Sequence, residues 1–238
     1  MALAGCGDDE DGSEGDALVV SAASSLTEPL EAYGDQTDAD EKYSFAGSDE
    51  LAAQIRKGAP VDVFASANTS LPDDLFEEGL VEEPQDFISN QLVLAVPSNS
   101  EIASIDDLTA GDLDLVIGAE GVPVGDYTRE VLGKLPADDS GAILDQVRSE
   151  EPDVKSIVGK LVAGAADAGF VYASDVNATS GDLVAIELPP DLEPVVTYGV
   201  AVVSDAENPD RAQEFIDSLV DGEAHELLLK TDFLEPAE

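Results

Sequence analysis

Hydroxyl side chains gather near the start of this sequence, where a strand gives way to a helix. The apolar run at residues 18–20 is typical of a buried strand in a parallel sheet. Ser24, Ser25 and Thr27 follow it, where a helix near residues 26–33 is expected to begin. A helix start leaves backbone N–H groups unpaired and carries a partial positive charge, so it is able to hold an anion.

The same residues also fit a purely structural role. Glu28 follows Ser25 at the spacing of a capping box, so this stretch taken alone favours Ser25 as an N-cap. Pro29 prefers the first helical position, which would move the cap toward Glu28.

Four further segments combine a strand end or a turn with the start of a helix. Taken alone, each segment is interpreted as a helix cap or a turn. Together they place hydroxyls and free amides at the carboxyl ends of parallel strands, where open α/β sheets bind ligands. The segments are 45–48 (Phe-Ala-Gly-Ser), 121–127 (Gly-Val-Pro-Val-Gly-Asp-Tyr), 151–156 (Glu-Pro-Asp-Val-Lys-Ser) and 170–175 (Phe-Val-Tyr-Ala-Ser-Asp).

Alternating strands and helices must position these segments. Short apolar runs alternate with helical stretches along most of the chain, which predicts βαβ units, parallel sheets and an α/β fold. Gly58 is expected to end a helix, a further helix is expected around residues 142–148, and helices at 209–219 and 223–230 close the chain.

Acidic residues dominate the composition. The 238 residues hold 53 Asp and Glu against 10 Lys and Arg, a formal charge of −43, yet 43% are hydrophobic, enough for one large domain or two lobes with cores. So acidic a surface repels nucleic acid and anionic membranes. We expect a halophilic archaeal source, because concentrated salt screens the repulsion. A calcium-binding acidic protein is the alternative, although no Asp-x-Asp-x-Asp-Gly loop is present.

Cysteine and histidine are nearly absent. One Cys excludes an internal disulfide, and with His225 as the single His we expect no Cys/His metal site, no cofactor and no His-dependent catalytic triad. Residues 3–6 (Leu-Ala-Gly-Cys) match a lipobox, and residues 7–16 have the composition of a flexible acidic tether. We therefore expect a lipid on Cys6 and a trimmed signal sequence before it; an incidental cysteine is the alternative.

Several of these motifs occur together in one family. Over residues 17–235 the chain resembles the molybdate-binding proteins of ABC transporters, within the two-lobed periplasmic binding proteins. The motifs that carry the resemblance are Ala22-Ala-Ser-Ser-Leu-Thr27, Phe45-Ala-Gly-Ser48, Gly58-Ala-Pro-Val-Asp-Val-Phe-Ala65, Val122-Pro-Val-Gly125 with Tyr127, and Phe170-Val-Tyr-Ala-Ser-Asp175.

The resemblance implies an α/β fold of the type II periplasmic-binding-protein kind. Each lobe would be a mostly parallel sheet flanked by helices, with the ligand in the cleft between the lobes. We expect residues 1–16 as tether, 17–93 plus 198–238 as lobe 1, and 94–197 as lobe 2. The resemblance also implies a monomeric, extracytoplasmic, membrane-anchored lipoprotein that is no enzyme and that delivers its ligand to a membrane permease.

The resemblance further implies the residues that hold the ligand. Ser25 and Ser48 would each offer a hydroxyl and a backbone N–H from lobe 1. Val124 and Val154 would offer backbone N–H groups from lobe 2, and Tyr172 its phenol. The sequence departs from the family pattern at three places: a valine at position 124 where a small residue is usual, Gly47 and Asp49 where hydroxyl residues are common, and a loose match at residues 151–153.

Neutral donors suit a tetrahedral dianion that carries no proton. Phosphate is partly protonated at neutral pH and would leave a buried donor unpaired. The resemblance implies molybdate as the ligand, with tungstate of nearly the same size; sulfate, which also carries no proton, or another oxyanion is the alternative. Asp49, Asp126 and Asp153 are interpreted as solvated acids at helix starts, with a place in the ligand shell as the alternative.

Two other classes of function remain open. A serine hydrolase would use Ser24 or Ser25, yet the chain lacks a Gly-x-Ser-x-Gly elbow and His225 falls on the expected last helix. The third class is a cell-surface interaction lipoprotein with no small ligand.

Overall fold

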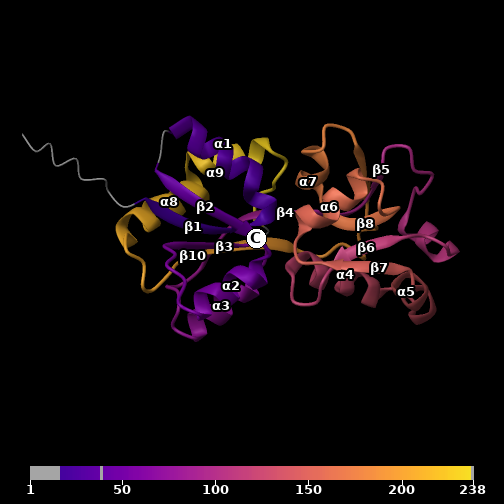
Figure 1. Cartoon of the computed structure of the whole chain (residues 1–238), viewed down its shortest axis with the longest axis horizontal. Helices are drawn as coiled ribbons and strands as arrows, with labels where there is room; N and C mark the ends of the chain where they lie inside the picture. The colour runs from indigo at the N-terminus through magenta and orange to yellow at the C-terminus, as the bar shows by residue number, and fades with distance from the viewer. Residues whose placement is uncertain (1–16, 38–39, 237–238) are drawn as a thin grey trace, which may run out of the picture.

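Residues 17–37 and 40–236, which the computed structural model describes, form two α/β lobes lying end to end (Figure 1). Cys6 and the expected tether lie outside the described residues. Each lobe is built on one five-stranded sheet with helices on both faces. The α/β fold and the two-lobed architecture predicted from the sequence are confirmed.

The first lobe is made from both ends of the chain. Helices α2 and α3 cover one face of its sheet, and α1, α8 and α9 cover the other (Figure 1). The strand order is β2-β1-β3-β10-β4. Its elements are β1 (Leu18–Ala23), the 3₁₀ turn η1 (Ser24–Leu26), α1 (Thr27–Thr37), β2 (Glu41–Ala46), α2 (Ser48–Arg56), β3 (Val63–Ser66), α3 (Ser70–Glu77), β4 (Gln85–Asn90), β10 (Val196–Val202), α8 (Pro209–Asp221) and α9 (Glu223–Lys230).

The second lobe is continuous in sequence and repeats the same topology. Its strand order, β7-β6-β8-β5-β9, corresponds position by position to that of the first sheet. Its elements are β5 (Leu92–Pro97), the 3₁₀ turn η2 (Ile105–Ala110), β6 (Leu115–Gly118), α4 (Pro123–Lys134), α5 (Ala137–Leu144), β7 (Val147–Glu151), α6 (Val154–Val162), β8 (Ala168–Tyr172), α7 (Ala173–Asn177) and β9 (Leu183–Glu187).

Both sheets are mixed, with one strand in each reversed. β10 is antiparallel to β3 and β4, and β5 is antiparallel to β8 and β9, whereas the other pairs are parallel. In each sheet four of the five strands run in the same direction, as predicted, although the reversed strand lies between two neighbours and makes both of its pairings antiparallel. The reversed strands are those by which the chain passes between the lobes, through Gln91 and through residues 188–195.

The lobe limits expected from the sequence divide these crossing strands. Leu92 and Val93, expected in lobe 1, pair with β8 of the second sheet, and Val196 and Thr197, expected in lobe 2, pair with β4 of the first. The chain crosses before each of these strands begins, at Gln91 and at residues 188–195, whereas the expected limits fall inside the apolar runs of the strands themselves.

Apolar strands form the cores. Every residue of β3, β6 and β8 is buried, because helices cover both faces of each sheet. One cluster of buried apolar residues continues from one lobe to the other, and within it the rings of Tyr198 and Tyr172 meet edge to face at 5.9 Å. The two lobes are thus in contact.

The helix predicted around residues 142–148 is wrong. α5 ends at Leu144, and β7 begins at Val147 and pairs with β6 at the sheet edge. Only one face of this edge strand is covered, so its sequence, Val-Arg-Ser-Glu-Glu, lacks the apolar run by which the central strands are recognised.

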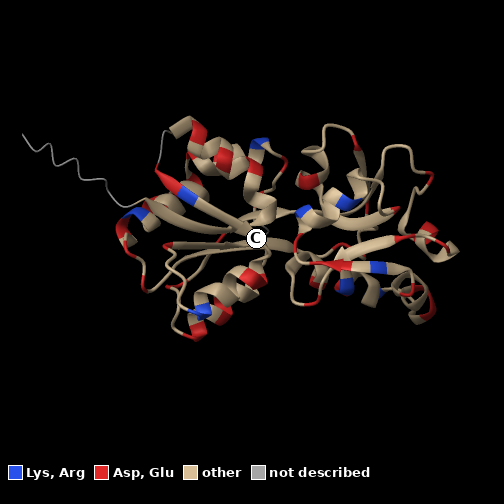
Figure 2. Cartoon of the chain, in the orientation of Figure 1, with Lys and Arg blue, Asp and Glu red and all other residues tan. Residues whose placement is uncertain are grey.

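Asp and Glu residues are spread over the helices and loops of both lobes (Figure 2). No helix in the described residues is long and apolar enough to cross a membrane.

Candidate functional site

A small cavity lies between the lobes, where strands end and helices begin. All five residues predicted to hold the ligand line it, so the fold brings together segments from both lobes that are far apart in sequence. The lining residues are Ala23, Ser24, Ser25, Ala46, Gly47, Ser48, Ala67, Val122, Pro123, Val124, Asp153, Val154 and Tyr172.

Three α-helices begin at this cavity. Ser48 is the first residue of α2, Val124 the second of α4 and Val154 the first of α6. The first backbone N–H groups of a helix have no partner within it. No side chain caps the starts of α2 and α4. The N–H groups and the positive ends of three helix dipoles therefore converge on one space that suits an anion.

The hydroxyl of Ser48 is free to donate into this space. The side chain is buried, and its oxygen accepts a hydrogen bond of 3.1 Å from the backbone N–H of Ala67. Since that bond occupies a lone pair, the Ser48 proton remains available for a ligand.

Ser25 does not cap a helix, so the capping-box interpretation of this residue is wrong. It lies inside the turn η1, whose N-cap is Ala23, and its oxygen lies 2.9 Å from the hydroxyl of Tyr198. Glu28, the expected second half of the capping box, instead accepts from Lys155 at 2.6 Å. Neither partner is near in sequence, so the spacing of Ser25 and Glu28 gave no sign of them.

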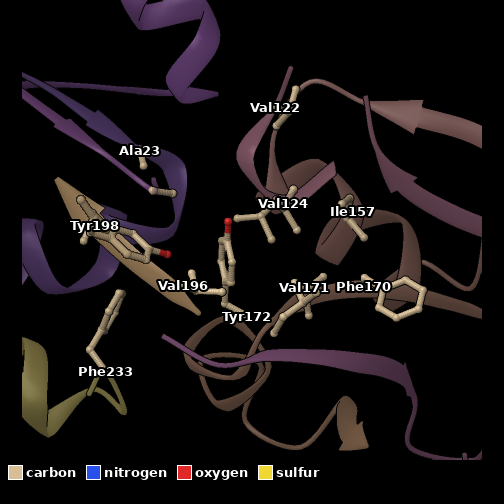
Figure 3. Packing of buried hydrophobic residues seen from close by; sticks show 14 of the residues in the cluster. Ala23, Val122, Val124, Ile157, Phe170, Val171, Tyr172, Val196, Tyr198 and Phe233 are labelled. Carbon is tan, nitrogen blue, oxygen red and sulfur yellow. The ribbon is translucent and has the colours of Figure 1, made fainter. Parts of the chain in front are cut away.

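The Tyr172 hydroxyl is buried at the cavity without a hydrogen-bond partner among the described residues. In Figure 3 the Tyr172 hydroxyl points toward Val124, and Tyr198 lies to the left of the Tyr172 ring. Burial raises the pKa of Tyr172 well above its ordinary value, so the phenol keeps its proton. A buried hydroxyl left unpaired costs about 1–3 kcal/mol, which an acceptor in the cavity would recover.

The three acids noted in the sequence lie at different places. Asp153 lines the cavity, and its carboxylate caps α6 by accepting from the backbone N–H of Ser156 at 2.8 Å. Asp126 accepts from the backbone N–H of Gly121 at 2.9 Å. Asp49 is half-buried beside the cavity, and burial raises its pKa. Neither Asp49 nor Asp126 is a lining residue.

A lysine beside the site has its charge neutralised. Lys155, on α6 of the second lobe, lies 2.6 Å from Glu28 of the first lobe and 3.0 Å from Asp175. The cavity lining itself contains no Lys or Arg. A bound anion would thus be held by neutral donors and helix dipoles.

The buried Asp175 carboxyl should make the folded protein less stable as the pH rises from about 4 to about 6. Burial raises its pKa from 3.8 to about 6, although Lys155 opposes the shift. The protonated group therefore contributes stability that is complete below about pH 4 and lost above about pH 6. Asp175→Asn should remove this dependence, measured as the difference in free energy of urea unfolding from wild type across this range. The exposed Asp191→Asn is the control, and a difference independent of pH at Asp175 would contradict the assignment.

His225 is not placed to activate Ser24 or Ser25. Its ring nitrogens lie 3.0 Å from the carbonyl oxygen of Leu219 and 3.2 Å from the carboxylate of Glu235. The described residues contain no group of three His, Cys, Asp or Glu side chains that could hold a metal ion.

Three residues around the site were missed from the sequence. Ala67 donates to Ser48, Tyr198 is hydrogen-bonded to Ser25, and Asn90 donates to Tyr198. Ala67 and Tyr198 contact a site serine directly and Asn90 does so only through Tyr198, and no local motif marks these residues.

Comparisons with known proteins agree with this geometry. The chain matches the family model described as bacterial extracellular solute-binding protein over residues 18–234. It is 33% identical to the molybdate-binding protein ModA of Mycobacterium tuberculosis H37Rv, across 92% of this chain and 85% of that protein. It is 32% identical to the molybdate-binding protein ModA of Escherichia coli K12, across 91% and 88%.

A solved structure shows the same fold. The periplasmic molybdate-binding protein of Azotobacter vinelandii superposes with a TM-score of 0.81 at 20% identity, over 92% of this chain and 100% of that one. The chain therefore belongs to the family of bacterial extracellular solute-binding proteins, in which the ModA proteins are its relatives.

Proposed function

We propose that this protein is the solute-binding component of an ABC importer, and that it captures molybdate or tungstate between its lobes for delivery to a membrane permease. The observation that carries the proposal is the buried Tyr172 hydroxyl, which has no partner among the described residues and lies at a cavity where three helices begin. The identity to molybdate-binding relatives supports the choice of ligand.

The proposed ligand shell consists of donors from both lobes. Ser25 and Ser48 offer hydroxyl and backbone N–H groups, Tyr172 its hydroxyl, and Val124 and Val154 backbone N–H groups. Each hydrogen bond from a neutral donor to an ionised oxygen contributes about 1.5–3 kcal/mol. Because the donors come from both lobes, a bound dianion would hold the lobes together, and the crossings at Gln91 and residues 188–195 would serve as the hinge.

Calorimetric titration tests the proposed ligand. The full chain, in molar KCl to screen its surface charge, is titrated separately with molybdate, tungstate, sulfate and phosphate. Molybdate and tungstate are expected to bind with similar affinity, and phosphate weakly or not at all. Sulfate binding tighter than molybdate would overturn the choice of ligand, and no heat from any of the four would overturn the transport function.

Ser48→Ala is expected to weaken molybdate binding by about 1–3 kcal/mol, because one charge-assisted hydrogen bond is lost. The dissociation constant from calorimetry is the measurement. Ser44→Ala, on the exposed face of β2, is the matched control and should bind as wild type does. Equal affinity of Ser48→Ala and wild type would remove Ser48 from the ligand shell.

The proposal extends to where the protein works. A lipid on Cys6 would hold a monomeric, non-enzymatic binding protein at the outer face of the membrane, and the charge of −43 suits a halophilic archaeal source. Cys6 lies outside the described residues, so the sequence at residues 3–6 and the extracellular family support this part.

A further inference from the structure

The hydroxyl of Ser25 belongs to a short chain of buried hydrogen bonds. Ser25 Oγ lies 2.9 Å from the hydroxyl oxygen of Tyr198, and Asn90 Nδ2 lies 3.5 Å from that same oxygen. All three side chains are buried. Ser25 lines the cavity, whereas Tyr198 and Asn90 do not.

The orientation of the Asn90 amide determines which atom donates in each of these hydrogen bonds. Its Oδ1 accepts a hydrogen bond of 2.9 Å from the backbone N–H of Gln91, so its Nδ2 faces Tyr198 and, at 2.8 Å, Ser174 Oγ. An amide nitrogen donates and does not accept. The Tyr198 oxygen is therefore the acceptor in its contact with Asn90.

The Tyr198 proton is then left with one acceptor. Its ring lies edge-on to the rings of Phe87, Tyr172 and Phe233, and its hydroxyl is hydrogen-bonded, within the described part of the chain, to Ser25 and Asn90. Burial raises the pKa of Tyr198 well above its ordinary value, so the proton stays on the phenol. Since Asn90 is a donor, Tyr198 donates to Ser25.

We infer that Tyr198 and Asn90 are positioning residues that fix Ser25 as a hydrogen-bond donor and thereby make the cavity select tetrahedral oxyanions that carry no proton. The inference rests on the proposed function and deepens it. One of the two lone pairs of Ser25 accepts from Tyr198, and no other acceptor for the Ser25 proton is present among the described residues, so Ser25 directs that proton into the cavity. Ser48 is fixed in the same way by the N–H of Ala67. A protonated oxyanion such as hydrogenphosphate then meets donors where it needs an acceptor.

The test compares wild type with Tyr198→Phe by calorimetry with molybdate, sulfate and phosphate at neutral pH. Without the phenol proton, Ser25 is free to rotate and to accept from the ligand. We expect molybdate and sulfate to bind more weakly and phosphate more tightly, so that the ratio of molybdate to phosphate affinity falls about tenfold. A merely structural role would weaken all three anions alike and leave this ratio unchanged, which would overturn the inference.

A second variant keeps the test decisive if Tyr198→Phe does not fold. Asn90→Asp has nearly the same volume but places an acceptor beside Tyr198, which should draw the phenol proton away from Ser25 and lower the same ratio. In the Ser25→Ala background, Tyr198→Phe should have no further effect on the ratio. A further decrease there would overturn the inference.

The outcomes separate the inference from the proposed function. A wild-type protein that binds none of the anions contradicts the function itself. A wild-type protein that binds molybdate, with a ratio that neither variant changes, contradicts the roles of Tyr198 and Asn90 alone.

Discussion

Replacing Gly47 with alanine is expected to weaken oxyanion binding about 10- to 100-fold while both lobes stay folded. A Cβ atom at Gly47 would lie 2.2 Å from the backbone carbonyl oxygen of Pro152 in the second lobe, and 2.8 Å from Asp49 Oδ1. The Asp49 side chain is able to rotate away, but a backbone carbonyl is not. Overpacking of this kind costs about 1–3 kcal/mol, and here the strain is relieved by moving the lobes apart.

Gly159→Ala is the matched control for Gly47→Ala. Gly159 lies on α6, and a Cβ atom at this position would have open space within 4 Å, so the same change should leave the affinity unaltered. Molybdate affinity by calorimetry and the radius of gyration by small-angle scattering with excess ligand are the measurements. A Gly47→Ala protein with wild-type affinity and wild-type compactness would show that the lobes need not meet here when the ligand is bound.

Tyr172→Phe is expected to change binding and stability in opposite directions. Loss of the hydroxyl should weaken molybdate binding by about 1–3 kcal/mol, since one donor to the dianion disappears. The ligand-free protein should be as stable as wild type or more stable, because the variant no longer buries an unpaired hydroxyl at this position. Calorimetry gives the affinity, and urea unfolding without ligand gives the stability.

Tyr43→Phe separates this effect from a general response to losing a phenol. The Tyr43 hydroxyl donates to Glu41 at 3.2 Å on β2, so its removal should leave the affinity unchanged and should not raise the stability. A Tyr172→Phe protein that is less stable than wild type without ligand would mean that the Tyr172 hydroxyl of the wild type has a hydrogen-bond partner in solution. That result would contradict its assignment as a free donor.

The framework of the site was predictable because it depends on local signals. Strand ends followed by Ser, Gly or Pro mark the starts of η1, α2 and α4, and Asp153 followed by Ser156 marks the start of α6. Parallel strands bring such starts to one edge of a sheet. Short segments of sequence were therefore enough to place these residues at helix starts or strand ends, whereas the family resemblance was needed to predict which of them hold the ligand.

The direction in which each hydroxyl donates was not predictable. It depends on Tyr198 for Ser25 and on Ala67 for Ser48, which are 173 and 19 residues away. The capping box at Ser25 was wrong for the same reason, since long-range partners of Ser25 and Glu28 replaced the local bond. The contact between Gly47 and Pro152 likewise exists only because the two lobes meet.

A crystal structure of the protein with molybdate, located by the anomalous scattering of molybdenum, tests the central claim most directly. We predict one molybdenum peak in the inter-lobe cavity, with the oxyanion oxygens about 2.7–3.2 Å from the donors on Ser25, Ser48, Val124, Val154 and Tyr172. A peak outside this cavity, or a carboxylate oxygen of Asp49, Asp126 or Asp153 bound to the metal, would contradict it.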